Sequence, residues 1–468
     1  MASRCGFWFF LSLFAALSSS PLQASLCSEA IVFAVTNPVS SAADYAAVVK
    51  KETGKQAIHI LTMDLSPDFA ASFRADDPDA IVVRVSNPPT AEDIGRLRAY
   101  GITHLLAGPL GLETIQPIAA ALQVPRIGPN PEVITSKFAL QRALEKAGQP
   151  NIPGLLVQNY DEALAAYEKF GPHVVVKPND GYGTVGVHFV NNVEQLNHAV
   201  DFSKGPLLIE KRVFGVEYFL DFVSYTDPNT GKTVHRFVNA ARYRKVELVK
   251  QAPIYSSIRI LPHSNEGILG RMSQQARAML DVAGVQSGSS HNEFMLEVHD
   301  PDALENLIEG QHYPEIEDSA PIFPIELNPR MPGGNVPGYL KRFALDTTSL
   351  NQTETAVRAV TDPYGLADIP EGWRLNNHLD ISFLFSPRVG RFNLNAVLAL
   401  KEKYNAAYPD VIRDVVPPGY KDGDEVPVTD DLFKALGKIV IVHPDPAVVS
   451  RISREIYEAC MRGDFLYP

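Results

Sequence analysis

Short apolar runs alternate with amphipathic stretches along residues 25–128. The pattern of a buried strand recurs at Ala30–Val35, Ile58–Met63, Ala80–Val85 and His104–Ala107. Helical spacing lies between these runs, at Ala42–Lys51, Asp93–Tyr100 and Thr114–Leu122. This alternation predicts a parallel sheet of Rossmann-like type. The first run is followed by TNPVSSA and not by a glycine fingerprint, so dinucleotide binding is not predicted there.

The pattern changes near Pro129. A helix is predicted from Pro129 to Lys146, and strand-like runs dominate the chain beyond it. We therefore expect a new, strand-rich unit to begin there and to run to about Gly334. The remainder of the chain, to Pro468, contains further strands and a final helix.

The first 24 residues have the layout of a secretory signal peptide. One arginine precedes an apolar run from Gly6 to Leu17, and small residues end at Ala24, which gives a cleavage site before Ser25. The run is too short to span a bilayer permanently. No other stretch is long and apolar enough, so no stable membrane anchor is predicted.

Composition narrows the class of protein. The chain has 468 residues, 45% hydrophobic and 21% charged, with a formal net charge of −12. This length predicts two or three domains, and the acidic balance without a basic run argues against nucleic acid as a partner. The cysteines Cys5, Cys27 and Cys460 form no CxxC pair, which excludes a zinc ribbon or a thioredoxin-type site. A pairing of Cys27 with Cys460 in an exported chain stays open.

A glycine-rich motif occupies residues 174–190, VVVKPNDGYGTVGVHFV. The run after the glycines is β-prone, so the motif predicts a hairpin and not the helix that a dinucleotide site needs. Such a turn can offer backbone N–H groups to phosphates, and Lys177 can add a positive charge. Protein kinases also use a glycine hairpin, but the HRD and DFG strings are missing. A plain hairpin with a surface lysine is the alternative.

A second motif, LLIEKRVFGVEYFLDFVS, spans residues 207–224. An apolar strand ends at Glu210, and a second strand carries Glu217. The linker from Lys211 to Val213 can place backbone groups against an adenine edge, and the carboxylates can accept hydrogen bonds from ribose hydroxyls. Solvent-facing glutamates are the alternative. A solvated strand face is also the favoured interpretation of the basic cluster Arg242, Arg244 and Lys245.

The third motif joins HNEF at 291–294 to IELNPR at 325–330. Glu326 and Asn328 share one face of a predicted strand, and Arg330 continues it. With Glu293 they form an oxygen-rich set that suits Mg²⁺ or Mn²⁺ shared with ATP phosphates. Arg330 can bind a carboxylate or phosphate bidentately. His291 shares the face of Glu293, where it either contacts substrate or has a structural role.

Together and in this order, the motifs resemble the ATP-grasp superfamily, in particular its carboxylate–amine (L-amino-acid) ligases. The similarity covers about residues 30–468, and GVQSGSSHNEF resembles the amino-acid ligase branch. It implies a Rossmann-like α/β preATP-grasp domain (25–128), an α+β ATP-grasp nucleotide-binding domain (129–338) and a small β-rich C-terminal closing subdomain (339–468). The implied nucleotide-binding residues are Lys137, Lys177, Gly181, Gly183, Thr184, Glu210, Val213 and Glu217. The implied metal ligands are Glu293, Glu326 and Asn328, and the implied catalytic residues are Arg330 and His291.

Three positions depart from the family pattern. Ser136 stands where an aspartate commonly precedes the nucleotide lysine, and Phe219 replaces a frequent serine. The run MPGGNVPG is richer in proline than the usual loop, which predicts an unusual acceptor pocket. None of these departures removes an implied metal ligand, so we expect catalysis to be intact.

The resemblance implies that a small carboxylate is joined to an amine through an acyl phosphate, with ATP and Mg²⁺ as cofactors. Two alternatives remain: a biotin-carboxylase-like subunit that activates bicarbonate, and an exported, non-catalytic nucleotide-binding protein. The second rests on residues 1–24. Because extracellular ATP is scarce, we expect the cytoplasm to be the site of action. Dimers are common among similar ligases, so the resemblance carries the expectation of a homodimer.

Overall fold

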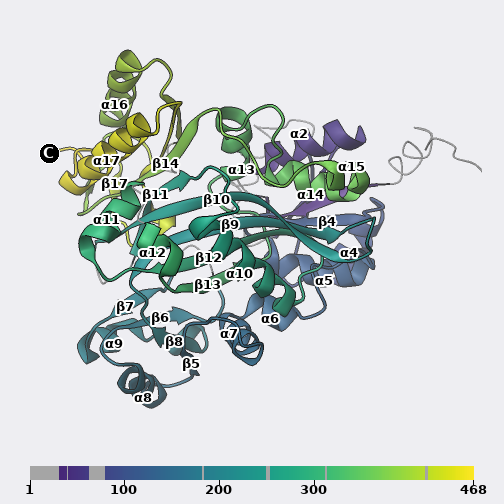
Figure 1. Cartoon of the computed structure of the whole chain (residues 1–468), viewed down its shortest axis with the longest axis horizontal. Coiled ribbons are helices and arrows are strands. Elements are labelled where there is room, and N and C mark those ends of the chain that lie inside the picture. The colour runs from purple at the N-terminus through teal and green to yellow at the C-terminus, as the bar shows by residue number, and fades with distance from the viewer. Residues whose placement is uncertain are drawn as a thin grey trace, which may run out of the picture.

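The computed structural model describes residues 31–38, 41–62, 80–181, 184–248, 253–310, 314–416 and 420–468. In Figure 1 a parallel sheet lies at one end, an eight-stranded sheet crosses the middle, and a second four-stranded sheet lies below it. The predicted signal segment 1–24, the cysteines Cys5 and Cys27, and Gly183 lie outside the described ranges.

The N-terminal sheet is parallel, with strand order β3-β2-β1-β4. Its elements are β1 (Phe33–Thr36), α2 (Ala42–Thr53), β2 (Ile58–Thr62), β3 (Ile81–Val85), α4 (Ala91–Arg98), β4 (His104–Ala107) and α5 (Leu112–Leu122). Each predicted strand and helix of this region is confirmed, with ends displaced by a few residues. β1 and β2 are buried at every position, which explains why their sequences are mainly apolar.

The predicted helix over residues 129–146 is in fact two helices, α6 (Pro131–Thr135) and α7 (Lys137–Lys146). Ser136 between them is extended, and its hydroxyl accepts a hydrogen bond from the backbone N–H of Ala139. The single-helix prediction was wrong because Ser136 caps the start of α7 with its side chain. A cap residue has an extended backbone, and this ends α6. The break places Lys137 at the start of α7.

The small sheet is antiparallel throughout, with order β5-β8-β6-β7. Its elements are β5 (Gly154–Val157), α8 (Tyr160–Phe170), β6 (Val174–Pro178), β7 (His188–Val190), α9 (Val193–Ala199), the 3-10 helix Phe202–Lys204 and β8 (Leu207–Lys211). β6 pairs with β7 directly, so the predicted glycine hairpin is confirmed.

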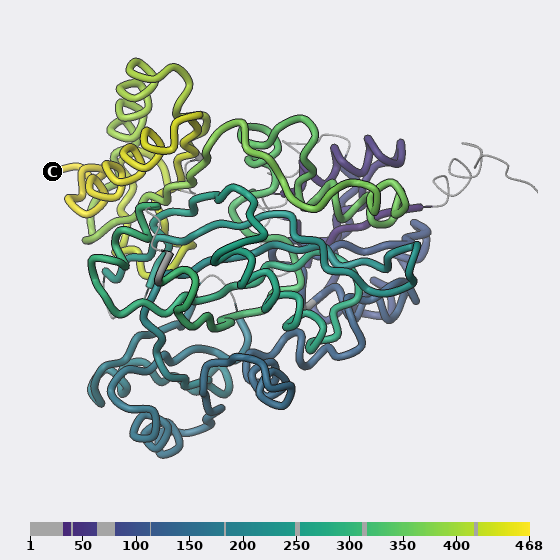
Figure 2. The backbone as a smooth tube through the Cα atoms, viewed as in Figure 1, coloured from purple at the N-terminus to yellow at the C-terminus, as the bar shows by residue number. Residues whose placement is uncertain are grey.

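The eight-stranded sheet has the order β13-β12-β9-β10-β11-β14-β18-β16, and every neighbouring pair is antiparallel. Its strands are β9 (Gly215–Thr226), β10 (Thr233–Glu247), β11 (Pro253–Ile260), β12 (Gly288–Glu297), β13 (Ile322–Asn328), β14 (His378–Leu384), β16 (Ile412–Val416) and β18 (Gly437–His443). The predicted C-terminal subdomain therefore adds its strands to this sheet. Figure 2 shows the C-terminal end on the side of the molecule away from the N-terminal sheet.

Helices surround this sheet and complete the fold. They are α10 (Gly267–Ala283), α11 (Pro301–Glu309), α12 (Pro314–Ser319), α13 (Val336–Tyr339), the π-helix Leu340–Ala344, α14 (Gln352–Thr361), α15 (Pro363–Asp368), α16 (Leu394–Ala407), the 3-10 helix Leu432–Lys434 and α17 (Pro446–Arg462). A two-stranded ribbon pairs β15 (Gly390–Arg391) with β17 (Glu425–Val426). Across the described ranges, no helix has the length and hydrophobicity to cross a bilayer.

Cys460 on α17 is fully buried in the C-terminal core, and burial raises the pKa of its thiol to about 12. The thiolate is the reactive form, so Cys460 should resist iodoacetamide at pH 8 in the folded protein and react after denaturation. Peptide mass spectrometry of the alkylated chain measures this. Rapid labelling of Cys460 under native conditions would contradict the packing of α17.

Candidate functional site

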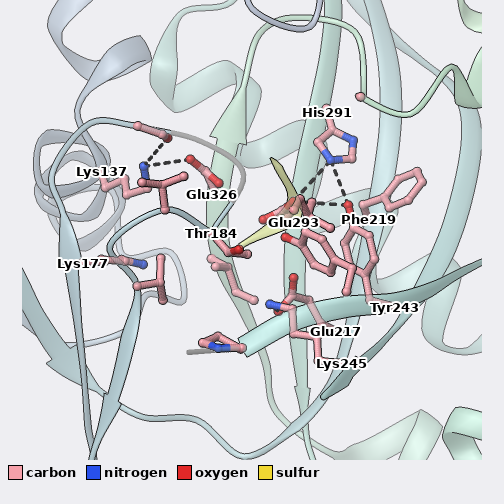
Figure 3. A pocket seen from close by; sticks show the side chains of 18 of the residues that line it. Lys137, Lys177, Thr184, Glu217, Phe219, Tyr243, Lys245, His291, Glu293 and Glu326 are labelled. Carbon is pink, nitrogen blue, oxygen red and sulfur yellow. Dashed lines mark hydrogen bonds and ion pairs between the residues drawn. The ribbon is translucent and has the colours of Figure 1, made fainter. Parts of the chain in front are cut away.

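A cavity of about 350 Å³ lies between the small sheet and the eight-stranded sheet. β6 and β8 line it from one side, and β9 to β14 line it from the other. We call it the central cavity, and Figure 3 shows the side chains that point into it. Every described residue that the sequence predicted for the site lines this cavity, with the exception of Asn328. Gly183 lies outside the described residues.

Lys177 supplies a buried positive charge to the cavity wall. The side chain lies on β6 and the residue is only 4% exposed. Its Nζ is 2.5 Å from Oε1 of Glu210 on β8. The other oxygen of Glu210, Oε2, accepts a hydrogen bond of 2.7 Å from Nε2 of Gln141 on α7. Lys177 is thus held in one position by a carboxylate that is itself fixed, which suits a cation that must bind phosphate.

Lys137 connects the small sheet to the eight-stranded sheet. Its Nζ is 2.9 Å from Oε1 of Glu326 on β13 and donates a hydrogen bond of 3.0 Å to the carbonyl of Gly181 (Figure 3). The position follows from the break at Ser136, because the first residue of α7 projects toward the glycine turn. Lys137 therefore contacts both Glu326 and the glycine turn at Gly181.

The glycine turn has backbone conformations that most residues avoid. Gly181 has φ +123°, and Thr184 has φ +62°. A side chain at position 181 would be strained, while its absence leaves the backbone accessible to a ligand. The Thr184 hydroxyl is buried against the cavity with no hydrogen-bond partner among the described residues. Both features suit a loop that binds phosphate oxygens.

Glu293 and Glu326 are directly opposite each other on β12 and β13. Side chains in such cross-strand positions have Cβ atoms roughly 5 Å apart. Both carboxylates line the central cavity, and Arg330 follows two residues after the end of β13. The structure thus brings together the two acids that lie 33 residues apart in the numbering of the chain.

Asn328 lines a different cavity from Glu293. It lines a neighbouring cavity of about 370 Å³, together with Glu326 and Arg330, which line both cavities. Its side chain is buried, and Nδ2 has no hydrogen-bond partner among the described residues. The predicted common face of positions 326, 328 and 330 is therefore shared between two adjoining cavities.

His291 is the centre of a buried hydrogen-bond network. Its Nδ1 is 2.8 Å from Oδ1 of Asp221, and its Nε2 is 3.3 Å from Oε1 of Glu293. Tyr243 Oη lies 3.2 Å from the same Nε2. Asp221 in turn accepts a hydrogen bond of 2.9 Å from Asn239.

The charges of this network are mutually stabilised. Burial by itself lowers the pKa of His291, but the bonds to Asp221 and Glu293 outweigh it and raise that pKa to about 9. Burial opposes ionisation of Glu293, and the bond to His291 more than reverses this, so the pKa of Glu293 lies below its usual range. At neutral pH we therefore expect a protonated His291 that holds an ionised Glu293 in position in the wall of the central cavity.

Glu217 and Lys245 form a third lysine–glutamate pair in the cavity, with 2.5 Å between Oε2 and Nζ. Burial raises the pKa of Glu217, Lys245 opposes the rise, and the nearby charge of Glu293 adds to it. The other oxygen of Glu217, Oε1, has no hydrogen-bond partner among the described residues. Val213 lies in the connection between β8 and β9 and lines the same cavity.

The predicted solvated face of Arg242, Arg244 and Lys245 is wrong. Lys245 lines the central cavity, and Arg242 is buried. Arg244 lies 2.6 Å from Glu309 of α11 and stacks over the Tyr457 ring of α17. Sequence analysis could not reveal this because the contacting residues Glu309 and Tyr457 come 65 and 213 residues further along the chain.

Sequence analysis also missed Asp221 and Tyr243. Asp221 follows Glu217 and Phe219 at intervals of two on β9, so all three share one face of the strand. The alternation in VEYFLDF could therefore have located Asp221. Tyr243 has no comparable pattern, because its role depends on its approach to His291, which is 48 residues away.

The donor groups suit a divalent cation that is shared with a polyphosphate. Within the described part of the chain, no three His, Cys, Asp or Glu side chains are arranged to hold a metal ion. Glu293, Glu326 and the amide of Asn328 instead offer hard oxygen donors that leave positions for phosphate oxygens. Lys137, Lys177 and Arg330 bring positive charge to the same region.

No protein-family model matches the chain. Solved structures match nearly its whole length. The L-amino acid ligase from Bacillus licheniformis has a TM-score of 0.66 at 14% identity, covering 92% of this chain and 97% of that one. Carboxyaminoimidazole ribonucleotide synthase from Aspergillus clavatus, complexed with ATP, has a TM-score of 0.64 at 15% identity, covering 93% and 99%.

This chain has the ATP-grasp fold. The ATP-grasp architecture confirms the predicted combination of a Rossmann-like α/β domain, an α+β nucleotide domain and a β-rich C-terminal part. N5-carboxyaminoimidazole synthetase from Staphylococcus aureus, complexed with ADP, adds a match with a TM-score of 0.62 at 15% identity, covering 92% of this chain and 96% of that one.

Curated relatives match shorter parts of the chain. Biotin carboxylase from Halalkalibacterium halodurans is 31% identical over 143 residues, which is 27% of this chain and 31% of that protein. The large chain of carbamoyl phosphate synthase from Thermoanaerobacter pseudethanolicus is 23% identical over 181 residues, or 35% of this chain and 17% of that protein. The chain thus spans about a third or less of the length of these relatives.

Proposed function

We propose that the chain is an ATP-dependent carboxylate–amine ligase that acts through an acyl phosphate. The observation that carries the proposal is the opposed pair Glu293 and Glu326 in one cavity with Lys177 and Arg330. Two acids, a fixed lysine and an arginine match the needs of phosphoryl transfer, in which positioning and charge neutralisation supply most of the catalysis. The structural neighbours, among them a ligase and enzymes complexed with ATP or ADP, support the proposal.

Each residue has a proposed part. Glu293, Glu326 and Asn328 would hold Mg²⁺, which neutralises the terminal phosphates when bound. Lys137 and Lys177 would bind phosphate oxygens, the glycine turn with Thr184 would cover them, and Arg330 would orient the carboxylate. The residues Glu210, Val213 and Glu217 would bind the adenosine. His291 would position Glu293 through the bond that joins them.

The proposed reaction has two steps. A carboxylate oxygen attacks the γ-phosphorus, the bond from that phosphorus to the bridging oxygen breaks, and ADP leaves. The amine then attacks the acyl carbon of the acyl phosphate, loses a proton and expels inorganic phosphate. Closure of the glycine turn would exclude water, which otherwise hydrolyses acyl phosphates.

Activation of bicarbonate by a biotin-carboxylase-like subunit is the second candidate function, favoured by the 31% identity to a biotin carboxylase.

We propose that the chain acts in the cytoplasm, because the reaction consumes ATP, and that it assembles as a homodimer. N-terminal sequencing of the mature protein tests the first of these, since removal of residues 1–24 would indicate export.

Hydroxylamine traps acyl phosphates as hydroxamates, so it replaces the unknown amine in a test of the proposed function. The full chain is incubated with Mg-ATP, hydroxylamine and single carboxylic acids, and both ADP and hydroxamate are measured. We expect equal amounts of the two products with at least one organic acid. ADP release only with bicarbonate would favour the second candidate, and ATP binding without any turnover would contradict both.

A further inference from the structure

One end of the central cavity is apolar. Ile258 of β11, Phe383 of β14 and Val336 of α13 line it, together with Phe433 on the 3-10 helix Leu432–Lys434. β11 and β14 lie beyond β10 in the strand order of the eight-stranded sheet, away from the acids on β12 and β13. The apolar end is therefore distinct from the wall that carries Lys177 and Glu210 on the small sheet.

The apolar end is fixed beside Arg330. The loop after Arg330 runs through Gly334 into α13, and the carbonyl of Gly334 accepts a hydrogen bond of 2.8 Å from Nζ of Lys438. Lys438 on β18 is the cross-strand partner of Phe383 on β14. This bond holds the loop of Arg330 against the strands that carry the apolar wall. A carboxylate bound at Arg330 would thus have its remaining atoms near Phe383 and Val336.

The ionisable side chains near this end already have partners. Lys245 is bonded to Glu217, and its Nζ lies over the ring of Tyr255. Lys438 donates to Gly334, as described above. The hydroxyl of Tyr243 lies within hydrogen-bond distance of His291 and Glu293. The side chains of Ile258, Val336, Phe383 and Phe433 offer hydrocarbon and aromatic surfaces to a ligand here.

We infer that the carboxylate substrate bears an uncharged, apolar side chain that fills the space between Phe383, Ile258, Val336 and Phe433. The inference rests on the ligase function proposed above and names the class of its first substrate. Burial of an apolar group against these walls is favourable, at roughly 25 cal/mol per Å² removed from water. Bicarbonate has no side chain and would leave the same walls in contact with water. A charged side chain would lose its hydration without gaining a partner.

The hydroxamate assay with matched acids tests the inference. The probes are 4-methylpentanoate and L-leucine as apolar acids, succinate and L-aspartate as charged acids of similar length, and bicarbonate. We expect kcat/KM for the better apolar acid to exceed that of its charged counterpart by at least about tenfold, as hydrophobic pockets typically discriminate. Turnover that favours the charged acids would overturn the inference while the ligase function stands. Turnover with bicarbonate alone would overturn the inference and favour the second candidate function. Turnover with none of the acids would overturn both.

A variant pair locates the specificity in the cavity. Phe433 is 63% exposed, so Phe433→Arg should fold, and its guanidinium would sit at the rim of the apolar end. We expect the ratio of kcat/KM for 4-methylpentanoate over succinate to fall by about tenfold, because the substitution removes an apolar contact and the guanidinium can pair with a second carboxylate. Tyr364→Arg, at a residue that is 62% exposed on α15, is the matched control and should keep the ratio. An unchanged ratio in Phe433→Arg would overturn the assignment of the apolar end as the side-chain pocket.

Discussion

The Lys177→Met variant should lose both nucleotide binding and stability. Removal of the cation leaves Glu210 buried without its partner at 2.5 Å, which costs about 3 kcal/mol in the free energy of unfolding. The same change removes the positive charge proposed to bind phosphate, so the affinity for Mg-ADP should fall at least about tenfold. Urea denaturation measures the first effect, and isothermal titration calorimetry measures the second.

A double variant separates these two effects. Lys177→Met combined with Glu210→Gln removes the unpaired charge, and the new glutamine can still accept the hydrogen bond from Gln141. Most of the lost stability should return, whereas nucleotide affinity should stay low. Normal binding of Mg-ADP by the stable double variant would show that Lys177 is only a structural partner of Glu210.

The Glu326→Gln variant should release ADP at least about a hundredfold more slowly than the unaltered chain, with a nearly unchanged midpoint of thermal unfolding. The glutamine keeps the size of the side chain but removes the charge proposed to hold Mg²⁺ and to pair with Lys137 at 2.9 Å. Stability should change little because the carboxylate of Glu326 is only partly buried and its replacement remains polar. Steady-state ADP release at saturating Mg-ATP is the measurement.

Glu402→Gln on α16 makes the same chemical change at an exposed position and serves as the control. Its rate should match that of the unaltered chain. If Glu326→Gln were as fast as Glu402→Gln, position 326 would not be a metal ligand, and the proposed arrangement of Glu293 and Glu326 around a cation would have to be abandoned.

Local sequence patterns predicted many of the helices and strands and part of the candidate site. Mainly apolar runs located β1 to β4; β1 and β2 are buried at every position, and β3 and β4 are partly buried. The two-residue spacing of Glu326 and Asn328 correctly placed both on β13. The glycines predicted the hairpin of β6 and β7 because few other residues adopt the conformation seen at Gly181.

The remaining features of the site depend on contacts between distant parts of the chain. The register that sets Glu293 opposite Glu326 includes an irregularity between Glu293 and Phe294, which no period-two pattern contains. Lys245 was interpreted as solvated because its partner, Glu217, is 28 residues earlier in the sequence. Asn328 was expected to share a face with Glu326, but Glu326 lines both cavities whereas Asn328 lines only the neighbouring one.

The continuity of the eight-stranded sheet has a consequence for any attempt to isolate the catalytic part of the chain. β14, β18 and β16 are hydrogen-bonded in series outward from β11, although they come from the last quarter of the sequence. A fragment that stopped after α13 would expose the backbone N–H and C=O groups of β11 as an open edge, which invites pairing with other molecules. It would also lack Phe383 and Phe433. A shortened chain therefore has to keep β14, β16 and β18, even though the proposed metal ligands Glu293, Glu326 and Asn328 all precede these strands.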